Sequence, residues 1–432
     1  MIDINFVREN PDLVAKGSMQ KGIKVDIGKL LILDEHRRDL LNQIDSVRQE
    51  RNQVAQASSG KKPDTEQQAR GQQLKAKLTQ LESDFKEADK DFLKLLRAVP
   101  NMPLEDVPIG DSEDENVVYK TGGNPPQFSF TPLSHQEIGE KLDLIDKVRA
   151  AKIAGSRFVY LKADLVRLQF AIIAFVINEL GNKEVIAKLI ADNHLNIPNH
   201  PFVPVLPPAL LKTAPYEASA RLNAEETTYK IEQDDLWLNA SAEHTLCTMF
   251  MDEVLPKDEL PLRFIGYSTS FRREAGSYGK DFEGILRLHQ FDKLEMEVFS
   301  TAESGLEEHK LLVAIQEHLV SSLGLPYQIM NKCTFDIGKP NARGVDINTW
   351  FPSQQLYRET HSADYLTDYQ TRDLKIRTRS DNNKLELVHT NDATAFAFSR
   401  ILAAIMENYQ DQDGHFNVPP VLVPYLGGQV KI

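Results

Sequence analysis

The chain has 432 residues with a formal net charge of -13, and 41% of its residues are hydrophobic. This length and composition predict a folded protein of two domains with a large core, and they exclude general disorder. The acidic balance excludes a protein that coats nucleic acid over its whole surface, and DNA is not an expected partner, but one local surface could still bind RNA.

The sequence also restricts the expected compartment. No apolar run reaches the about 20 residues needed to cross a bilayer. The N-terminal residues MIDINFVRENPDL lack the features of a signal peptide. Only Cys247 and Cys333 occur, without paired spacing, which indicates neither a disulfide framework nor a cysteine zinc site. A cytoplasmic protein without membrane contact is therefore expected.

Two runs in the first hundred residues have apolar positions in alternating steps of three and four, the spacing of a coiled-coil seam. They extend from Leu30 to Val54 and from Leu74 to Val99, and SSGKKPD at 58–64 favours a tight reversal between them. The pattern predicts a long antiparallel helical hairpin. Its basic side chains include Arg37, Arg38, Arg48, Arg51, Lys61, Lys62, Arg70, Lys75 and Lys77. Taken alone, these charges are typical of an ordinary solvated coiled coil.

The hairpin is expected to end at VPNMP (99–103), and an acidic, irregular segment follows to about Phe128. From about Phe130 the sequence alternates between helical and strand patterns. Residues 163–180 are apolar nearly all round, which predicts a buried helix. The run HPFVPVLPP (200–208) is β-like but interrupted by prolines.

The segment 271–298, FRREAGSYGKDFEGILRLHQFDKLEMEV, indicates two strands joined by a loop with glycines. The first strand is expected to end at 271–274. Alternation in the second places Arg287, His289, Phe291, Lys293, Glu295 and Glu297 on one face, and Leu286, Leu288, Leu294 and Met296 mainly on the other. The polar face packs poorly on a core but suits a ligand with phosphates, a flat base and an amine. Alternation alone is also compatible with a hairpin that has one solvated face.

This segment closely resembles motif 2 of class II aminoacyl-tRNA synthetases, and FRREAGS followed by HQFDKLE resembles the seryl-tRNA synthetase form. The run at 200–208 resembles motif 1, which lies at the homodimer interface of the family. YRETHS (357–362), followed by TDYQTRDL, resembles the family's Glu-x-x-Ser strand, and Arg400 before ILAAIMENYQ stands where the motif 3 arginine belongs. The resemblance spans nearly the whole chain.

The resemblance implies an α+β fold in three parts. These are an N-terminal helical arm that binds tRNA (1–104), a linker (105–129) and a class II catalytic domain with an antiparallel sheet flanked by helices (130–432). It also implies a cytoplasmic, homodimeric serine–tRNA ligase. Such an enzyme activates L-serine with ATP to seryl-adenylate and pyrophosphate. It then transfers serine to the 3′ end of tRNA(Ser), and of tRNA(Sec) where present.

Two alternatives belong to other classes. One is a synthetase-like ligase that loads an amino acid onto a carrier protein, against which the RNA-type hairpin speaks. The other is a non-catalytic RNA-binding relative. Retention of the catalytic-site side chains speaks against this second alternative, because binding RNA through the hairpin needs none of them.

The chemistry requires positioning of the substrates and neutralisation of phosphate charge. Arg272 suits the α-phosphate, because a guanidinium matches two phosphate oxygens. By resemblance, Glu274 accepts from the adenine amino group and Phe291 stacks on adenine. The implied catalytic residues are Arg272, Glu359 and Arg400. The implied ATP site is Arg272, Arg273, Glu274, Leu288, Phe291, Glu359, Thr360, His361, Ser362 and Arg400. Glu359 and Ser362 are hard oxygen ligands that suit Mg²⁺.

The implied serine site is Ser241, Ala242, Glu243, Arg272, Glu295 and Thr394. Within it, Ser241-Ala242-Glu243 resembles the family's Thr-Ala-Glu loop, and Glu243 would take the substrate ammonium. Such a pocket rejects alanine because its polar groups would be left unpaired. The implied tRNA-binding residues of the hairpin are Arg51, Lys61 and Lys62.

The chain departs from the family pattern around this pocket. NDATAFAFSR (391–400) stands where members typically have LNGSGLAVGR, and HSADYL (361–366) stands where SSCSNC is common. Three glycines thus become Ala393, Ala395 and Ser399, the asparagine becomes Asp392, and two aliphatic residues become Phe396 and Phe398. Side chains in place of glycine are expected to change how closely the backbone approaches the ligand. Compensation among Asp364, Tyr365 and Asp392, together with retention of the polar ligands, favours a diverged but active enzyme.

Overall fold

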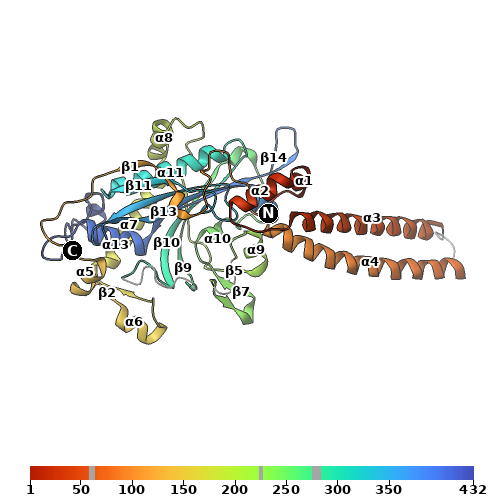
Figure 1. The fold of residues 1–432 in the computed structure, drawn as a ribbon, viewed down its shortest axis with the longest axis horizontal. Coiled ribbons are helices and arrows are strands. Elements are labelled where there is room, and N and C mark those ends of the chain that lie inside the picture. Colours follow the sequence, from red (N-terminus) through yellow and green to blue (C-terminus); the bar gives the residue numbers. More distant parts are fainter. Residues whose placement is uncertain (58–63, 223–226, 275–283) are drawn as a thin grey trace. The chain divides into compact units, whose positions relative to one another are not determined.

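The computed structural model describes residues 1–57, 64–222, 227–274 and 284–432 (Figure 1). The chain forms two compact units, Met1–Met102 and Pro103–Ile432. The three-part division at residues 104 and 129 expected from the sequence stays a prediction. None of the helices in these described ranges combines the length and apolarity needed to cross a lipid bilayer.

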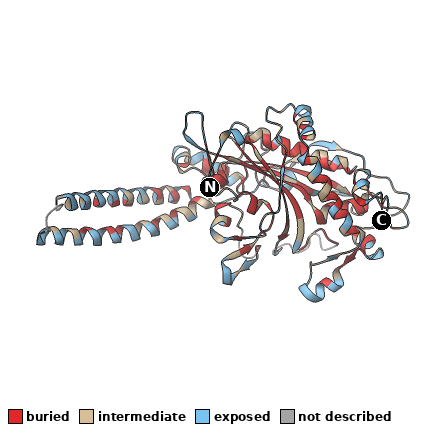
Figure 2. Cartoon of the chain, turned by 180° about the vertical axis from the view of Figure 1, so that it is seen from behind, coloured by how far each residue is buried: buried red, intermediate tan, exposed pale blue. Residues whose placement is uncertain are grey.

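The first unit contains the expected helical hairpin. After α1 (Ile4–Glu9) and α2 (Pro11–Gln20), the long helices α3 (Ile27–Ala57) and α4 (Thr65–Ala98) lie side by side (Figure 1). Asp64 begins α4 with a capping box, in which its side chain accepts from the Gln67 backbone and the Gln67 side chain accepts from the Asp64 backbone. Figure 2 shows a buried stripe along the facing sides of the two helices. The stripe is made by Leu40, Ile44, Val47, Leu74, Leu78, Leu81 and Ala88.

Several basic side chains of the hairpin bind the facing helix. Arg48 lies 2.9 Å from Glu82, and Arg70 pairs with Glu50. Arg37 lies 3.0 Å from Asp89 and 4.3 Å from the centre of the Phe92 ring. These arginines therefore help to hold the two helices together.

The second unit is built on one eight-stranded sheet in the order β1-β11-β12-β13-β16-β10-β9-β4. All neighbouring strands are antiparallel except β4 and β9, which are parallel. In sheet order the bounds are Val117–Gly122, Tyr327–Asn331, Arg343–Phe351, Leu356–Thr367, His389–Ala397, Gln290–Ser300, Leu262–Phe271 and Val203–Val205. The architecture confirms the α+β fold predicted from the sequence.

Helices α11 (Gly305–Ser322) and α13 (Phe398–Asn408) pack against the central strands and share a large apolar core with them. The fully buried Gln316 of α11 donates through Nε2 to the backbone oxygens of Ser362 on β13 (2.8 Å) and Thr394 on β16 (2.9 Å). Because side chains alternate along a strand, residues that point away from this core are available for a site.

The helix expected at 163–180 is α7 (Asp164–Gly181), but it is not buried all round. Leu165, Leu168 and Phe175 lie in the core, whereas Phe170 is 60% exposed. The prediction of a helix here was therefore correct, but the prediction that it is buried on every side was wrong.

Shorter elements complete the second unit. The helices are α5 (His135–Lys141), α6 (Lys147–Ala154), α8 (Lys183–Asp192), α9 (Thr213–Ala218), α10 (Glu243–Leu246) and α12 (Tyr369–Leu374). The strands of the small sheets are β2 (Ile145–Asp146), β3 (Tyr160–Leu161), β5 (Leu210–Lys212), β6 (Lys230–Ile231), β7 (Leu236–Leu238), β8 (Val254–Leu255), β14 (Arg377–Arg379) and β15 (Leu385–Leu387).

A fully buried ion pair joins the sheet to α11. Arg263 of β9 donates from both Nε and Nη2 to the carboxylate of Glu308, each at 2.8 Å, and its Nη1 donates to the backbone oxygen of His200. Neither side chain of the pair is exposed. An unpaired charge at this depth would be costly.

We expect Glu308→Ala to lower the free energy of unfolding by about 3–5 kcal/mol, because it leaves Arg263 buried without its partner. Urea-induced unfolding of the purified protein measures this. The double variant Arg263→Met/Glu308→Met removes both charges and should recover most of the loss. A double variant less stable than Glu308→Ala would contradict this account.

Candidate active site

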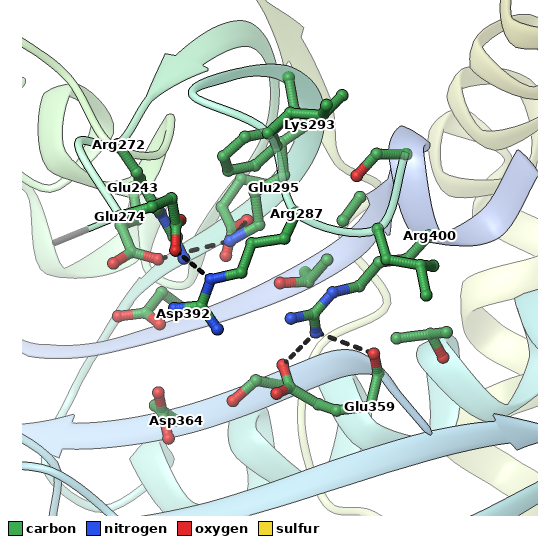
Figure 3. A pocket seen from close by; sticks show the side chains of 18 residues that line it. Glu243, Arg272, Glu274, Arg287, Lys293, Glu295, Glu359, Asp364, Asp392 and Arg400 are labelled. Atoms are coloured by element: carbon green, nitrogen blue, oxygen red, sulfur yellow. Dashed lines mark hydrogen bonds and ion pairs between the residues drawn. The ribbon is translucent and has the colours of Figure 1, made fainter. Parts of the chain in front are cut away.

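A cavity of about 280 Å³ opens on the sheet face away from the core helices. Its walls come from β10, β13 and β16, from the segments next to β9 and β10, and from the start of α10 and α13. The lining residues are Glu243, Arg272, Glu274, Leu286, Arg287, Leu288, Phe291, Lys293, Glu295, Glu359, Thr360, Ser362, Asp364, Asp392, Thr394, Ala397, Ser399 and Arg400. Figure 3 shows the charged members of this set gathered around one space.

Arg272 and Phe291 form one wall. The Arg272 guanidinium lies 5.2 Å from the centre of the Phe291 ring, and its Nε donates to the Ala240 backbone oxygen (3.1 Å). Arg273, which the sequence assigned to the ATP site, does not line the cavity. Its guanidinium lies over the Tyr229 ring, 5.6 Å from the centre, because consecutive side chains point to opposite sides.

The second strand of this segment starts later than expected. β10 begins at Gln290, so 284–289 is not a strand and does not follow the predicted alternation. As a result Leu286, Arg287 and Leu288 all line the cavity. Leu286 and Leu288 are nevertheless buried in the apolar core with Leu294 and Met296, on the side predicted for them. His289 lies beside Phe158, with ring centres 5.4 Å apart, and does not line the cavity.

Glu274 and Arg287 form an ion pair across the open side of the cavity (Figure 3). Glu274 has a positive φ of 51°, an uncommon conformation for a residue with a side chain. The residues after Glu274, including Gly276 and Gly279 of the predicted loop, lie outside the described part of the chain until Gly284.

Arg400 and Glu359 form another ion pair in the cavity (Figure 3). Arg400 lies in the first turn of α13, and its Nη1 lies 2.9 Å from Glu359 Oε1 and donates to the Glu359 backbone oxygen at 2.8 Å. Burial alone would raise the pKa of Glu359, but Arg400 and Lys332 hold it below its ordinary value. An anionic ligand that takes Arg400 would release this carboxylate.

A β-bulge in β13 decides which of its residues face the cavity. The register with β12 shifts between Ile347 and Asn348, opposite Thr360. Glu359, Thr360 and Ser362 consequently all line the cavity. Glu359 and Ser362 present two hard oxygen groups there, a donor set that fits Mg²⁺.

His361, also assigned to the ATP site from the sequence, is placed in the core. Its ring is 1% exposed and lies 5.2 Å from the Phe396 ring, centre to centre. Burial lowers its pKa to about 3, so the ring is neutral near pH 7. The structure therefore gives the His361 side chain no role in binding phosphate.

Three carboxylates meet at the floor of the cavity. Oxygen atoms of Glu243, Glu295 and Asp392 all lie within 4.8 Å of one another. Two cationic side chains form ion pairs with these carboxylates. Lys293 Nζ lies 2.5 Å from Glu295, and Arg221 lies 3.3 Å from Glu243 and pairs closely with Asp392. The spacing would suit a metal ion, but these side chains already supply positive charge there.

The electrostatics keep Glu243 ionised. Burial alone would raise the pKa of this carboxyl, but Arg221 and Lys293 hold it well below its ordinary value. Burial likewise disfavours a charged guanidinium, yet Asp392 and Glu243 raise the pKa of Arg221 above its ordinary value. The floor of the cavity is thus a set of paired charges in a buried environment.

Ser241 and Ala242, assigned to the serine site from the sequence, lie behind the lining. Neither side chain is exposed, and Ala242 is the residue before α10. The Ser241 hydroxyl accepts from Lys293 Nζ (3.0 Å) and donates to Glu243 (3.3 Å). The structure brings Glu243, Arg272, Glu295 and Thr394 together in the cavity as expected.

Sequence reasoning missed Arg221 altogether. It lies in an irregular segment after α9, and no local sequence pattern predicts its contacts with Glu243 and Asp392. Lys293 was placed on the ligand face by strand alternation but was given no role. Glu297, expected on the same face, is fully buried beneath the cavity opposite Asp392, and burial raises its pKa well above the ordinary value.

The structure explains part of the departure from the family pattern. Ala393 and Ala395 are fully buried in the apolar core and do not line the cavity. Tyr365 is also buried, and its hydroxyl bonds to His389 Nδ1 at 2.7 Å. A Cβ at Gly305 would lie 2.6 Å from that hydroxyl, so this glycine makes room for Tyr365. Only Ser399, of the three positions where glycine is usual, faces the cavity.

Comparison with known proteins identifies relatives of both units of the chain. The family model of the seryl-tRNA synthetase N-terminal domain matches residues 1–103. The model of the class II tRNA synthetase core domain (G, H, P, S and T) matches residues 228–409. The chain is 38% identical to the serine–tRNA ligase of Deinococcus radiodurans, covering 99% of this chain and 98% of that protein. It is 35% identical to that of Nitrosopumilus maritimus over the full length of both.

Solved structures give the same result. The crystal structure of seryl-tRNA synthetase from Pyrococcus horikoshii complexed with ATP matches with a TM-score of 0.84 and 33% identity, covering all of both chains. The cytoplasmic serine–tRNA ligase of Naegleria fowleri in complex with AMP has a TM-score of 0.81 at 26% identity, covering 100% of this chain and 98% of that one. The chain therefore belongs to the seryl-tRNA synthetase family of class II synthetases. This confirms the family and the serine–tRNA ligase function predicted from the sequence.

We expect Ala393→Gly and Ala395→Gly each to lower the free energy of unfolding by about 1–2 kcal/mol, from added backbone freedom and a lost buried methyl group. Neither change should alter the KM for a substrate. Ser399→Gly, which changes the lining of the cavity, serves as the comparison and should change KM instead. Unfolding curves and steady-state kinetics of the three variants measure this, and altered KM values in the two alanine variants would contradict it.

Proposed function

We propose that this cavity performs the serine activation expected of a family member, with ATP along the Arg272–Arg400 wall and serine at the carboxylate floor. One observation carries the proposal. A single cavity holds cationic side chains and an aromatic ring suited to a nucleotide, and it also holds clustered carboxylates suited to an ammonium group. Those two sets of groups match the two substrates of a serine–tRNA ligase.

In the first step, a carboxylate oxygen of serine attacks the α-phosphorus of ATP. The new P–O bond gives seryl-adenylate, and the bond to the bridging oxygen breaks to release pyrophosphate. Arg272 supports this step because its guanidinium, held beside Phe291, stabilises charge on the α-phosphate oxygens. Arg400 exchanges Glu359 for the terminal phosphate, and its side chain then lies on the adenine face away from Phe291.

Glu359 and Ser362 would hold Mg²⁺, which when bound neutralises charge on the phosphates of ATP. Glu359 suits this role because it faces the cavity and pairs there with the Arg400 side chain, which a phosphate could replace. The hydroxyl of Ser362 lines the same wall.

Serine is held at the floor of the cavity. Glu243 accepts from the ammonium group, and Glu295 accepts from the ammonium or the hydroxyl. Thr394, cross-strand partner of Glu295, offers a hydroxyl beside it. Without a substrate hydroxyl these buried polar groups would stay unpaired, which rejects alanine.

The second step transfers serine to the 3′ end of tRNA, and we assign tRNA recognition to the helical hairpin. Arg51 supports this assignment, because it is exposed, whereas Arg37, Arg48 and Arg70 bind the facing helix. Lys61 and Lys62, the other tRNA-binding residues expected from the sequence, lie outside the described residues.

We also propose that the enzyme is a cytoplasmic homodimer. The motif 1 region supports the dimer, because it combines the short edge strand β4 with apolar side chains that a partner would cover. Val203 is 53% exposed and Leu206 is 82% exposed. Both cysteines are free, as expected in a reducing compartment.

The activation step is tested by ATP–pyrophosphate exchange with a panel of amino acids. We expect serine to exchange fastest, ahead of glycine, alanine and threonine, because of the polar floor. Arg272→Ala should slow exchange by about 3 kcal/mol of transition-state stabilisation, the typical loss of one charge-assisted contact in a closed site.

The matched control is Arg379→Ala, an exposed arginine of β14 that does not line the cavity. It should exchange at the rate of the unchanged protein. Faster exchange with another amino acid would refute the serine site, and a near-normal rate for Arg272→Ala would remove Arg272 from its role.

The hairpin assignment is tested in the full chain by Lys61→Glu/Lys62→Glu. We expect weaker tRNA binding and a salt dependence reduced by about 0.7–0.9 per lost phosphate contact in the slope of log K against log salt. Pyrophosphate exchange should not change, because the cavity residues all belong to the second unit.

The control variant Lys183→Glu/Lys384→Glu makes the same charge change at exposed positions of the second unit. Filter binding across a salt series compares the two variants. Equal weakening of tRNA binding in both would show a general charge effect and would argue against the hairpin as the recognition element.

A further inference from the structure

Arg221 reaches the floor of the cavity from a segment outside every sequence motif. Its backbone N–H donates to the Ser219 hydroxyl (3.2 Å), and the Ser219 backbone oxygen accepts from the buried Gln370 side chain (3.0 Å). Ala220, between them, has a positive φ of 59°. A non-glycine residue in this conformation indicates that the surrounding contacts determine the path of the segment.

The guanidinium of Arg221 is shared by two carboxylates. Its Nη2 donates to Asp392 in a close contact, and its Nε lies 3.3 Å from Glu243. Side-chain exposure is 14% for Arg221 and 5% for Asp392, so little water screens the pair. Asp392 is therefore the closer of the two partners of the guanidinium.

The carboxyl groups at the floor outnumber the cations that pair with them. Three carboxylates meet there, Glu243, Glu295 and Asp392, and two cations pair with them, Arg221 and Lys293. Glu297 lies beneath them, where burial favours its neutral form. Asp364, the cross-strand partner of Asp392, also lines the cavity; burial raises its pKa, and Lys332 and Arg221 offset part of that effect. Burying more carboxylates than cations is costly, so a positively charged ligand suits the site.

We propose that Arg221 and Asp392 act as one positioning pair that leaves Glu243 free to bind the ammonium group of the amino acid. The inference rests on the proposed function. Arg221 and the substrate ammonium compete for the Glu243 carboxylate. Because Asp392 binds Arg221, it weakens the interaction of Arg221 with Glu243. The aspartate that replaces the typical asparagine of the family thus has a partner, and the two residues depend on each other.

This pairing predicts that the single substitutions are harmful and that the double substitution is not. Asp392→Asn leaves Arg221 with Glu243 alone, which neutralises the carboxylate that the substrate needs. Arg221→Met leaves Asp392 without its closest cation and leaves Glu243 with Lys293, 3.8 Å away. Arg221→Met/Asp392→Asn removes the acidic and the basic member of the pair together and leaves Glu243 with Lys293. Removing a buried ion pair as a unit is also much less damaging than breaking it.

The test is a double-mutant cycle in serine-dependent pyrophosphate exchange with the full chain. We expect Asp392→Asn to raise the KM for serine about tenfold, and Arg221→Met to lower kcat/KM for serine about tenfold. The double variant should return to within about threefold of the unchanged protein. The KM for ATP should stay the same in all variants, whereas a loss of structure would change the KM values for both serine and ATP.

Losses that add in the double variant, or a KM for ATP that rises together with that for serine, would overturn the proposal. If Arg221→Met does not fold, as thermal unfolding would show, the comparison of Asp392→Asn with the double variant decides alone. Arg379→Met is the control for an arginine-to-methionine change at an exposed site. If the unchanged protein fails to activate serine, the proposed function fails, which is a different result from additive losses in an active enzyme.

Discussion

The antiparallel register of β10 with its two neighbours is the constraint on which the site depends. Pairing with β9 places Phe291 opposite Ser270, close to Arg272 just beyond the strand end. Pairing with β16 places Glu295 opposite Thr394 and Glu297 opposite Asp392. A slip of one residue would turn the polar side chains of β10 into the core. The nucleotide wall and the carboxylate floor therefore come from one register.

That arrangement brings several carboxyl groups together in a buried place, and nearby cations pair with them. Lys293 comes from β10 itself, next to the carboxylates in sequence, whereas Arg221 comes from a distant segment anchored by Ser219 and Gln370. Elsewhere in the cavity, Arg400 forms an ion pair with Glu359. These charged side chains of the cavity are thus paired with one another.

The departures from the family pattern follow the two faces of the strands. Ala393 and Ala395 add methyl groups to the core face, where they pack and leave the cavity alone. Asp392 faces the cavity and adds a carboxyl group, which pairs with the Arg221 guanidinium. Substitutions on the core face therefore change the packing of the core, and the substitution on the cavity face changes the electrostatics of the site.

The sequence by itself determined the helical hairpin, the order of the motifs and most of the cavity lining. Heptad spacing reports burial directly, and strand alternation carries Phe291, Lys293 and Glu295 to one face. Only the tertiary structure decided what local patterns do not encode. The late start of β10 put Leu288 in the cavity, the bulge in β13 turned His361 into the core, and a distant segment brought Arg221 to Asp392. Each of these depends on hydrogen bonding or ion pairing between residues far apart in the chain.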